Sequence, residues 1–433
     1  QATFVLAEQL SKEAIIFRRD GDEAAARAKR FEAAEAFLAY TREYPDDSDI
    51  FRKAFYNVGQ NYAEAGDYEQ ANSYFQQYVD RFPEDELSWP LTFRIALNYA
   101  STLELAEAVR YFEQLYSSAG KDYVDAPIAL YNAAFLRIGM NDYRGAAQGF
   151  ERYAREFPDI ADAEDVMFRA GQQWEKVDEE EGTSEALKFY KRYLTRYQGD
   201  DPDHMMEAYN RIAELTEASG ARDRVVDAAW DDLSKAYASY KTQIGPAGRH
   251  YAAHAEFRQV QREFDAFKEI KYTSNDTRNA ELLIQQKPED LSALEARCMA
   301  MITEYADFEY SSAALYIAGL SYLTYADMLY DAPPPKGLDD EEIDLYREAI
   351  DERRLPIEDK GKNRLSANLQ KAADEHRWSQ WMTKTKQELA RRFPGEFAPE
   401  KGEIRGEGDS NYVPGAGPIS VRQDEAAEEE GQQ

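Results

Sequence analysis

Small and apolar residues between positions 54 and 83 recur with the spacing of helices rather than of strands. Within residues 54–62, and again within residues 71–82, they stand three or four positions apart, which places them on one face of a helix. Residues 66–68, Gly-Asp-Tyr, supply a turn between the two segments. Pro83 has no backbone N–H to donate and ends the second helix. The stretch therefore predicts a helical hairpin with one apolar face.

Copies of this hairpin follow along the chain. The small residue that opens each second helix returns every 37–40 residues. A two-helix unit cannot bury its apolar face alone, so consecutive copies are expected to stack and to share one continuous core. These small residues are Ala33, Ala71, Ala108, Ala146 and Ala186.

Over residues 33–197 the pattern resembles the tetratricopeptide repeat family. The resemblance implies an all-α fold, a right-handed α-solenoid superhelix of stacked helical hairpins. In such a hairpin the small residues let the two helices approach closely, and the aromatic residues fill the space beside them. With Arg52 as the first position, the matching residues are Gly59 at position 8, Tyr62 at 11, Ala71 at 20, Phe75 at 24 and Pro83 at 32.

Three copies depart from the pattern. In the copy that starts near Trp89, Ala96 replaces the glycine and residues 101–105 replace the turn motif. An acidic insertion at residues 178–182 lengthens a loop in a later copy. A sixth unit, at residues 207–215, keeps a first helix but lacks the closing proline.

A turn cluster at residues 245–248, Gly-Pro-Ala-Gly, is the basis of the predicted domain limits. We expect an N-terminal array of about five to six repeats over residues 1–244. A degenerate, repeat-like helical region is expected over residues 245–397. Residues 398–433 are rich in Gly, Pro and acidic residues, have little to bury, and predict a disordered tail.

The chain carries 52 Lys and Arg against 83 Asp and Glu, a net charge of −31 over 433 residues. A surface of that sign repels nucleic-acid phosphates and anionic lipid head groups, and it favours basic proteins. No apolar run reaches the roughly 18 residues that a membrane span needs. We therefore expect other proteins, including basic ones, as partners, and neither nucleic acid, nor a direct membrane span, nor a small molecule.

No catalytic motif stands in the sequence, neither a GxxxxGK phosphate loop, nor a GxSxG elbow, nor a GxGxxG turn after a strand. The single cysteine, Cys298, has no plausible histidine partner nearby. His250 and His254 stand one helical turn apart, as a metal-binding pair would, but Tyr251 occupies the place where metalloproteases have a glutamate. We expect no enzyme activity, no cofactor and no metal site.

Tyr-Asn pairs recur in the first helices, with the asparagine at the sixth position of the repeat. In the tetratricopeptide family this position lines the concave groove, so the resemblance implies that the amides bind the backbone of an extended peptide. The alternative is that they bond neighbouring helices or water. The basic residues do not recur in the order that gripping a terminal carboxylate requires, which leaves internal peptide segments or a folded surface as ligands. The candidates for binding a partner are Lys53, Tyr56, Asn57, Arg94, Tyr131, Asn132, Tyr209 and Asn210.

These features predict a non-catalytic protein–protein interaction scaffold that binds a partner segment in its concave groove. The first alternative is a structural subunit of a large envelope or motility machine, packing through its convex face and ends. The second is a small-ligand-binding protein or an enzyme, with a pocket between the array and the helical segment after Gly248.

Repeats longer than 34 residues that end in Tyr-Pro or Phe-Pro resemble bacterial cell-envelope proteins, namely the outer-membrane assembly lipoproteins and the coordinators of the Tol-Pal system. The prolines of residues 331–337, the helix at residues 346–350 and Trp378 resemble repeat proteins of the myxobacterial envelope and gliding machinery. The resemblance implies a periplasmic or envelope-associated protein, with the cytoplasm as the alternative. A signal peptide would precede Gln1, which is not the cysteine that lipidation requires.

Overall fold

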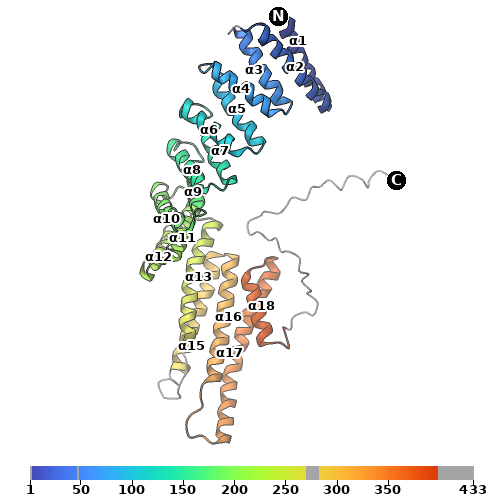
Figure 1. Cartoon of the computed structure of the whole chain (residues 1–433). Coiled ribbons are helices and arrows are strands. Elements are labelled where there is room, and N and C mark those ends of the chain that lie inside the picture. The colour runs from blue at the N-terminus through green and yellow to red at the C-terminus, as the bar shows by residue number, and fades with distance from the viewer. Residues whose placement is uncertain (1, 46–47, 270–281, 398–433) are drawn as a thin grey trace, which may run out of the picture. The chain divides into compact units, whose positions relative to one another are not determined.

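The computed structural model describes residues 2–45, 48–269 and 282–397 (Figure 1). Its regular structure is helical, and no β-strand occurs among these residues. The predicted all-α fold is confirmed. No helix within the described ranges combines the length and the hydrophobicity that crossing a membrane requires. The predicted tail, residues 398–433, lies outside the described residues.

The chain divides into two compact units. The first consists of Gln1–Ile270 with Ser292–Ala314, and the second of Lys271–Leu291 with Leu315–Gln433. The domain limits expected from the sequence, residues 1–244 and 245–397, stay predictions.

The first unit is a stack of helical hairpins. Each helix packs against the next one in the chain, so that successive hairpins lie side by side (Figure 1). This is the arrangement of stacked hairpins that the apolar pattern predicts. The paired helices are α1 (Ala2–Arg19) and α2 (Glu23–Glu43), α3 (Asp49–Glu64) and α4 (Tyr68–Arg81), α5 (Ser88–Ser101) and α6 (Leu105–Ala119), α7 (Ala126–Gly139) and α8 (Tyr143–Glu156), α9 (Ala163–Trp174) and α10 (Glu179–Arg196), and α11 (Pro202–Ala218) and α12 (Asp223–Tyr240).

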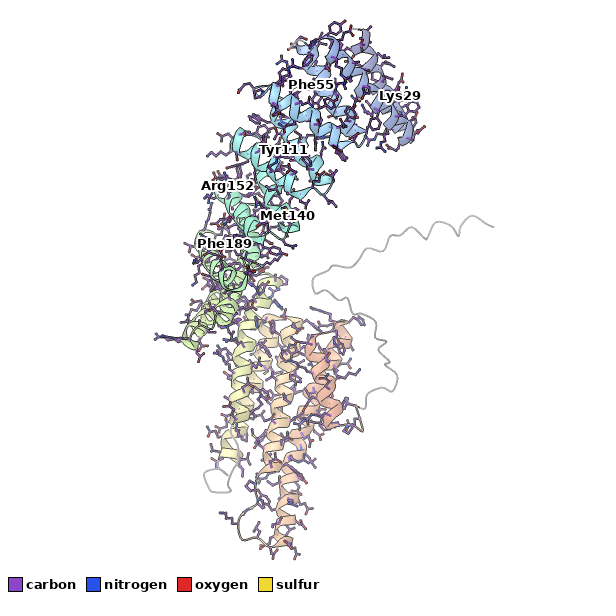
Figure 2. The ribbon with its side chains drawn as sticks, viewed as in Figure 1. Lys29, Phe55, Tyr111, Met140, Arg152 and Phe189 are labelled. Carbon is purple, nitrogen blue, oxygen red and sulfur yellow. The ribbon has the colours of Figure 1, made fainter. Side chains whose placement is uncertain are left out.

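Aromatic side chains of the second helices press against glycines of the first helices. Phe75 of α4 is fully buried, and a Cβ atom at Gly59 of α3 would lie 2.5 Å from two carbons of its ring. Gly171 of α9 faces Tyr190 of α10 in the same way, at 2.8 Å. These distances leave no room for a methyl group, so the glycines allow the rings to reach the helix backbone. Figure 2 shows the side chains of the stack, with the buried Phe55 of α3 labelled.

The turns inside three hairpins share one backbone conformation. Gly66, Leu103 and Asn141 all adopt a left-handed φ, of 77°, 62° and 59°. Leu103 stands in the copy that lacks the turn motif, yet it forms the same turn. The backbone N–H of Glu104 donates to Tyr99 O at 2.9 Å, and the other two turns have the same hydrogen bond at the equivalent positions. A non-glycine residue in this region costs about 1–2 kcal/mol. The stack therefore imposes the turn against the local preference of the chain.

The turn cluster at residues 245–248 is fixed to α11. Asp203 accepts a hydrogen bond from the backbone N–H of Gly245 at 2.6 Å. A Cβ atom at Gly245 or at Gly248 would lie 2.5 Å or 2.6 Å from an oxygen of the same carboxylate. The glycines are needed because the backbone passes so close to Asp203, and helix α13 (Pro246–Glu269), which follows, packs on α11 and α12.

The second unit also uses glycines where two helices cross. A Cβ atom at Gly361 of α17 (Asp340–Glu375) would lie 2.9 Å from the backbone oxygen of Gly319 in α16 (Phe308–Asp331). Arg392 of α18 (Gln380–Arg392) pairs with both Asp327 and Glu388. Helix α15 (Lys287–Tyr305) belongs to the first unit from Ser292 on, and the π-helical turn η1 (Leu282–Gln286) belongs to the second.

Replacing Gly59 by valine is expected to destabilise the first unit by about 1–3 kcal/mol, because the added methyl groups must displace the buried ring of Phe75. Urea unfolding followed by far-ultraviolet circular dichroism measures the change. The matched control is Gly395→Ala, at a glycine with open space around its Cβ position. A Gly59→Val protein that unfolds at the wild-type urea concentration would contradict the close contact.

Candidate partner-binding face

One position recurs across the first helices of five consecutive hairpins. It is the sixth residue of the α3 repeat, and its successive copies follow after 37, 38, 37 and 41 residues. An aromatic residue precedes it each time. Since the hairpins stack in register, equivalent positions fall on one side of the array. We call this set the position-six ladder. Its residues are Asn57, Arg94, Asn132, Arg169 and Asn210, preceded by Tyr56, Phe93, Tyr131, Phe168 and Tyr209.

At α3 the predicted residues leave polar groups available. Lys53 is exposed, and Asn57 is half-buried. The side-chain amide of Asn57 makes no hydrogen bond to any residue that the structure describes, while its backbone oxygen accepts one from Asn61 Nδ2 at 2.8 Å. Tyr56 packs toward Phe75, with 6.5 Å between the ring centroids. The amide of Asn57 is therefore open to a ligand.

On α7 the ladder is surrounded by apolar surface. Ile128 and Phe135 are each 51% exposed, and Tyr131 stacks on Phe135 with 6.3 Å between ring centroids. Asn132 is half-buried, and within the described part of the chain no side chain or backbone group bonds to its amide. This helix offers an exposed apolar stripe with an available amide beside it.

Arg169 joins the ladder, although it was not among the residues predicted from the sequence. Its guanidinium donates to the hydroxyl of Tyr131 at 2.8 Å, which links α9 to α7. It is exposed, and no carboxylate among the described residues pairs with it. The signal that could have found it is the constant spacing, since a search for repeated Tyr-Asn pairs passes over the intervening Phe-Arg pairs.

At α11 the ladder is covered. Asn210 is 3% exposed, and its Oδ1 lies 2.9 Å from Nδ1 of His254 on α13. Tyr209 is half-buried, and burial raises the pKa of its hydroxyl. The amide of Asn210 is therefore used inside the first unit, because α13 packs over α11 at this point. The binding roles of the predicted residues stay predictions.

His250 and His254, which have the spacing of a metal-binding pair, each form a hydrogen bond with a different residue. His250 Nδ1 lies 3.0 Å from Asp307 Oδ2, and this hydrogen bond raises the pKa of His250. Burial lowers the pKa of His254, which bonds to Asn210. Cys298 is fully buried, and burial raises the pKa of its thiol to about 12, so that it is protonated at neutral pH.

A third histidine stands among carboxylates. His204 Nδ1 lies 3.3 Å from both carboxylate oxygens of Glu164, and Asp165 is close enough to complete a set of metal-ligand types. The imidazole ring stacks on Phe168 with 4.5 Å between centroids. The hydrogen bond to Glu164 raises the pKa of His204. While His204 is protonated, its contact with Glu164 is an ion pair between α11 and α9.

Comparison with known families finds the tetratricopeptide repeat. Its model matches residues 53–85 and 128–159, which are the α3–α4 and α7–α8 hairpins. This repeat fold suggests a protein–protein interaction scaffold, and the matched family is not an enzyme family. No match was found among curated proteins.

Among solved structures, a tetratricopeptide repeat protein from Parabacteroides merdae is 12% identical with a TM-score of 0.30, covering 81% of this chain and 99% of its own. The type IV pilus biogenesis factor PilW is 15% identical with a TM-score of 0.26, covering 53% of this chain and 93% of its own. The TPR2AB domain of yeast Sti1 in complex with pHSP90 is 16% identical with a TM-score of 0.24, covering 60% of this chain and 96% of its own. Similarity at this level says nothing about a partner of this chain.

The ion pair of His204 is expected to make stability depend on pH. The folded-state pKa of His204 lies above the ordinary 6.5, so its contribution is fully present below pH 6.5 and is lost as the pH rises through the raised value. The difference in free energy of unfolding between wild type and His204→Gln should therefore be larger at pH 5.5 than at pH 8.5. Urea titrations at several pH values measure it.

Glu164→Gln is the matched control for His204, because it keeps a hydrogen-bond acceptor and removes the charge. In the Glu164→Gln protein, the change in free energy of unfolding caused by His204→Gln should vary much less with pH. If the difference in free energy of unfolding between wild type and His204→Gln grows with rising pH, the ion pair is contradicted.

Proposed function

We propose that this chain is a non-catalytic scaffold that holds an extended segment of another protein against the first helices of its hairpin stack. The proposal rests on α7, where an exposed apolar stripe and an available amide stand side by side. An exposed apolar surface of this kind is unfavourable in water and is commonly a binding surface. The half-buried amide can donate to a backbone carbonyl and accept from a backbone N–H of the same segment.

The spacing of the ladder supports an extended ligand. Asn57 and Asn132 stand on α3 and α7 with Arg94 on α5 between them, so one segment that crosses the first helices would meet amide and guanidinium groups in turn. A compact small ligand would touch only one of these hairpins. An extended peptide also has unpaired backbone groups, which are what free amides can satisfy.

The proposed setting is the bacterial cell envelope, in the periplasm. It is supported by the long repeats with their Tyr-Pro and Phe-Pro endings, which resemble those of envelope repeat proteins. Fractionation of cells that express the full-length protein from its own gene tests this setting. Recovery with the cytoplasmic proteins would contradict it.

One observation favours a second candidate, a structural subunit that packs through the end of its array. Helix α1 exposes Val5, Leu6, Ile15 and Ile16 at 61%, 56%, 57% and 49%. In the first unit α1 packs on α2, and these side chains remain in contact with solvent. An assembly that stacks a further helix on α1 would bury them.

Site-specific photo-crosslinking distinguishes the two candidates. A photoreactive amino acid is placed at Phe135 on the proposed binding face, at Leu6 on the end face, and at Lys188 on the exposed side of α10 as a control. The proposal predicts a crosslinked partner from position 135 and none from position 188. A partner captured only from position 6 would favour end packing, and a partner captured only from position 188 would contradict both.

The partner found in this way is then titrated against the double variant Asn57→Ala/Asn132→Ala. Each lost hydrogen bond removes about 0.5–1.5 kcal/mol, so the affinity of the double variant should fall by about fivefold to a hundredfold. Asn363→Ala, which changes an exposed asparagine of α17, is the matched control and should bind like wild type. An unchanged affinity in the double variant would move the interface away from the ladder.

A further inference from the structure

A pocket in the first unit collects arginines in a chain that is otherwise strongly acidic. Its volume is about 620 Å³, and it lies between the end of α1, the start of α2, the α3–α4 turn and the last turns of α5. Four arginines line it, against two glutamates. The arginines are Arg18, Arg27, Arg30 and Arg94, and the glutamates are Glu23 and Glu64. We call it the arginine pocket.

One of the four arginines is buried and bonded within the pocket wall. Arg30 is 9% exposed and pairs with Glu64, and its Nη1 donates to Asn61 Oδ1 at 3.1 Å. Ser11 donates to the same Asn61 oxygen at 3.1 Å. This network ties α1, α2 and α3 together, so that Glu64 is neutralised within the wall and the wall is held rigidly.

The other three arginines stand at the rim, and two of them have no carboxylate partner among the described residues. Arg27 and Arg94 are exposed, and neither pairs with a carboxylate in the ranges that the structure describes. Arg18 lies 3.8 Å from Glu23, but both side chains are largely exposed, which leaves that pair weak and exchangeable. The rim can therefore turn its guanidinium groups toward a ligand without breaking a buried ion pair.

The local charge, rather than the net charge of −31, decides what this pocket attracts. At physiological ionic strength charges are screened over about 8 Å, so distant carboxylates act weakly on a group inside the pocket. Guanidinium groups bind carboxylates with two parallel hydrogen bonds. The arginines therefore favour an anionic group inside this pocket, in spite of the net negative charge of the chain.

The size and the remaining walls indicate a peptide rather than a single small anion. A volume of 620 Å³ is that of about 20 water molecules at ~30 Å³ each. The wall also contains Leu97, which is 38% exposed and offers apolar contact beside the arginines. A segment that carries carboxylate side chains next to small or apolar residues matches both kinds of surface.

We infer that the arginine pocket binds Asp and Glu side chains of an acidic peptide segment, through Arg18, Arg27 and Arg94. This inference rests on the proposed scaffold function and names the chemistry of the partner at one end of the binding face. Arg94 belongs both to the pocket and to the position-six ladder, so one extended segment can pass from the pocket to α7. The basic partner expected from the net charge would be repelled here.

Fluorescence anisotropy with the full chain tests the inference. The probe is a short labelled peptide of Glu, Ala and Leu, and its counterpart has Gln in place of every Glu. We expect the acidic probe to bind more tightly than the Gln peptide and to weaken as sodium chloride rises. Arg27→Gln and Arg94→Gln should each lower its affinity about two- to fivefold, and together about tenfold.

Arg224→Gln, an exposed arginine on α12, is the matched control and should leave the affinity unchanged. Equal binding of the acidic and Gln peptides, or an equal loss from Arg224→Gln, would overturn the inference. Displacement of the probe by low-millimolar inorganic phosphate in preference to unlabelled acidic peptide would also overturn it, by assigning the pocket to a small anion. Crosslinking from Phe135 is independent of these outcomes, so the arginine pocket can fail while the scaffold function stands.

Discussion

The structure depends on close packing between the two helices of a hairpin, seen most directly where a glycine of the first helix meets an aromatic ring of the second. Where Gly59 meets Phe75, and where Gly171 meets Tyr190, the ring lies against the helix backbone with no space for a methyl group. A hairpin joined so closely still has apolar faces on its outer sides, and only a neighbouring hairpin can cover them. Stacking follows, and it leaves one side of the first helices facing solvent.

That uncovered side is where charge and polarity matter. The chain has a net charge of −31, but screening limits the influence of each charge to nearby groups. The proposed recognition uses groups that have no side-chain hydrogen bond or ion pair among the described residues, namely the amides of Asn57 and Asn132 and the guanidinium groups of Arg27 and Arg94. On this proposal, partners are selected through local chemistry at the binding face rather than through the net charge.

The candidate site followed from the sequence only in part. The repeated Tyr-Asn pairs correctly place Asn57 and Asn132 at equivalent positions of the stack, because periodicity fixes which residues share a helix face. The same rule includes Asn210, yet α13 covers it and His254 takes its amide. Arg169 has the right spacing and the same residue type as Arg94, but the repeated Tyr-Asn pairs do not point to it.

The sequence by itself determined the helical hairpins, their order and their apolar faces, since helix periodicity, small residues and prolines act over a few positions along the chain. Tertiary structure decided what those local signals do not encode. Stacking holds Leu103 in a left-handed turn, and the carboxylate of Asp203 anchors Gly245, so that α13 closes over α11. It also gathers Arg18 and Arg94 in one pocket, because contacts between residues far apart in sequence depend on how whole helices pack rather than on any local pattern.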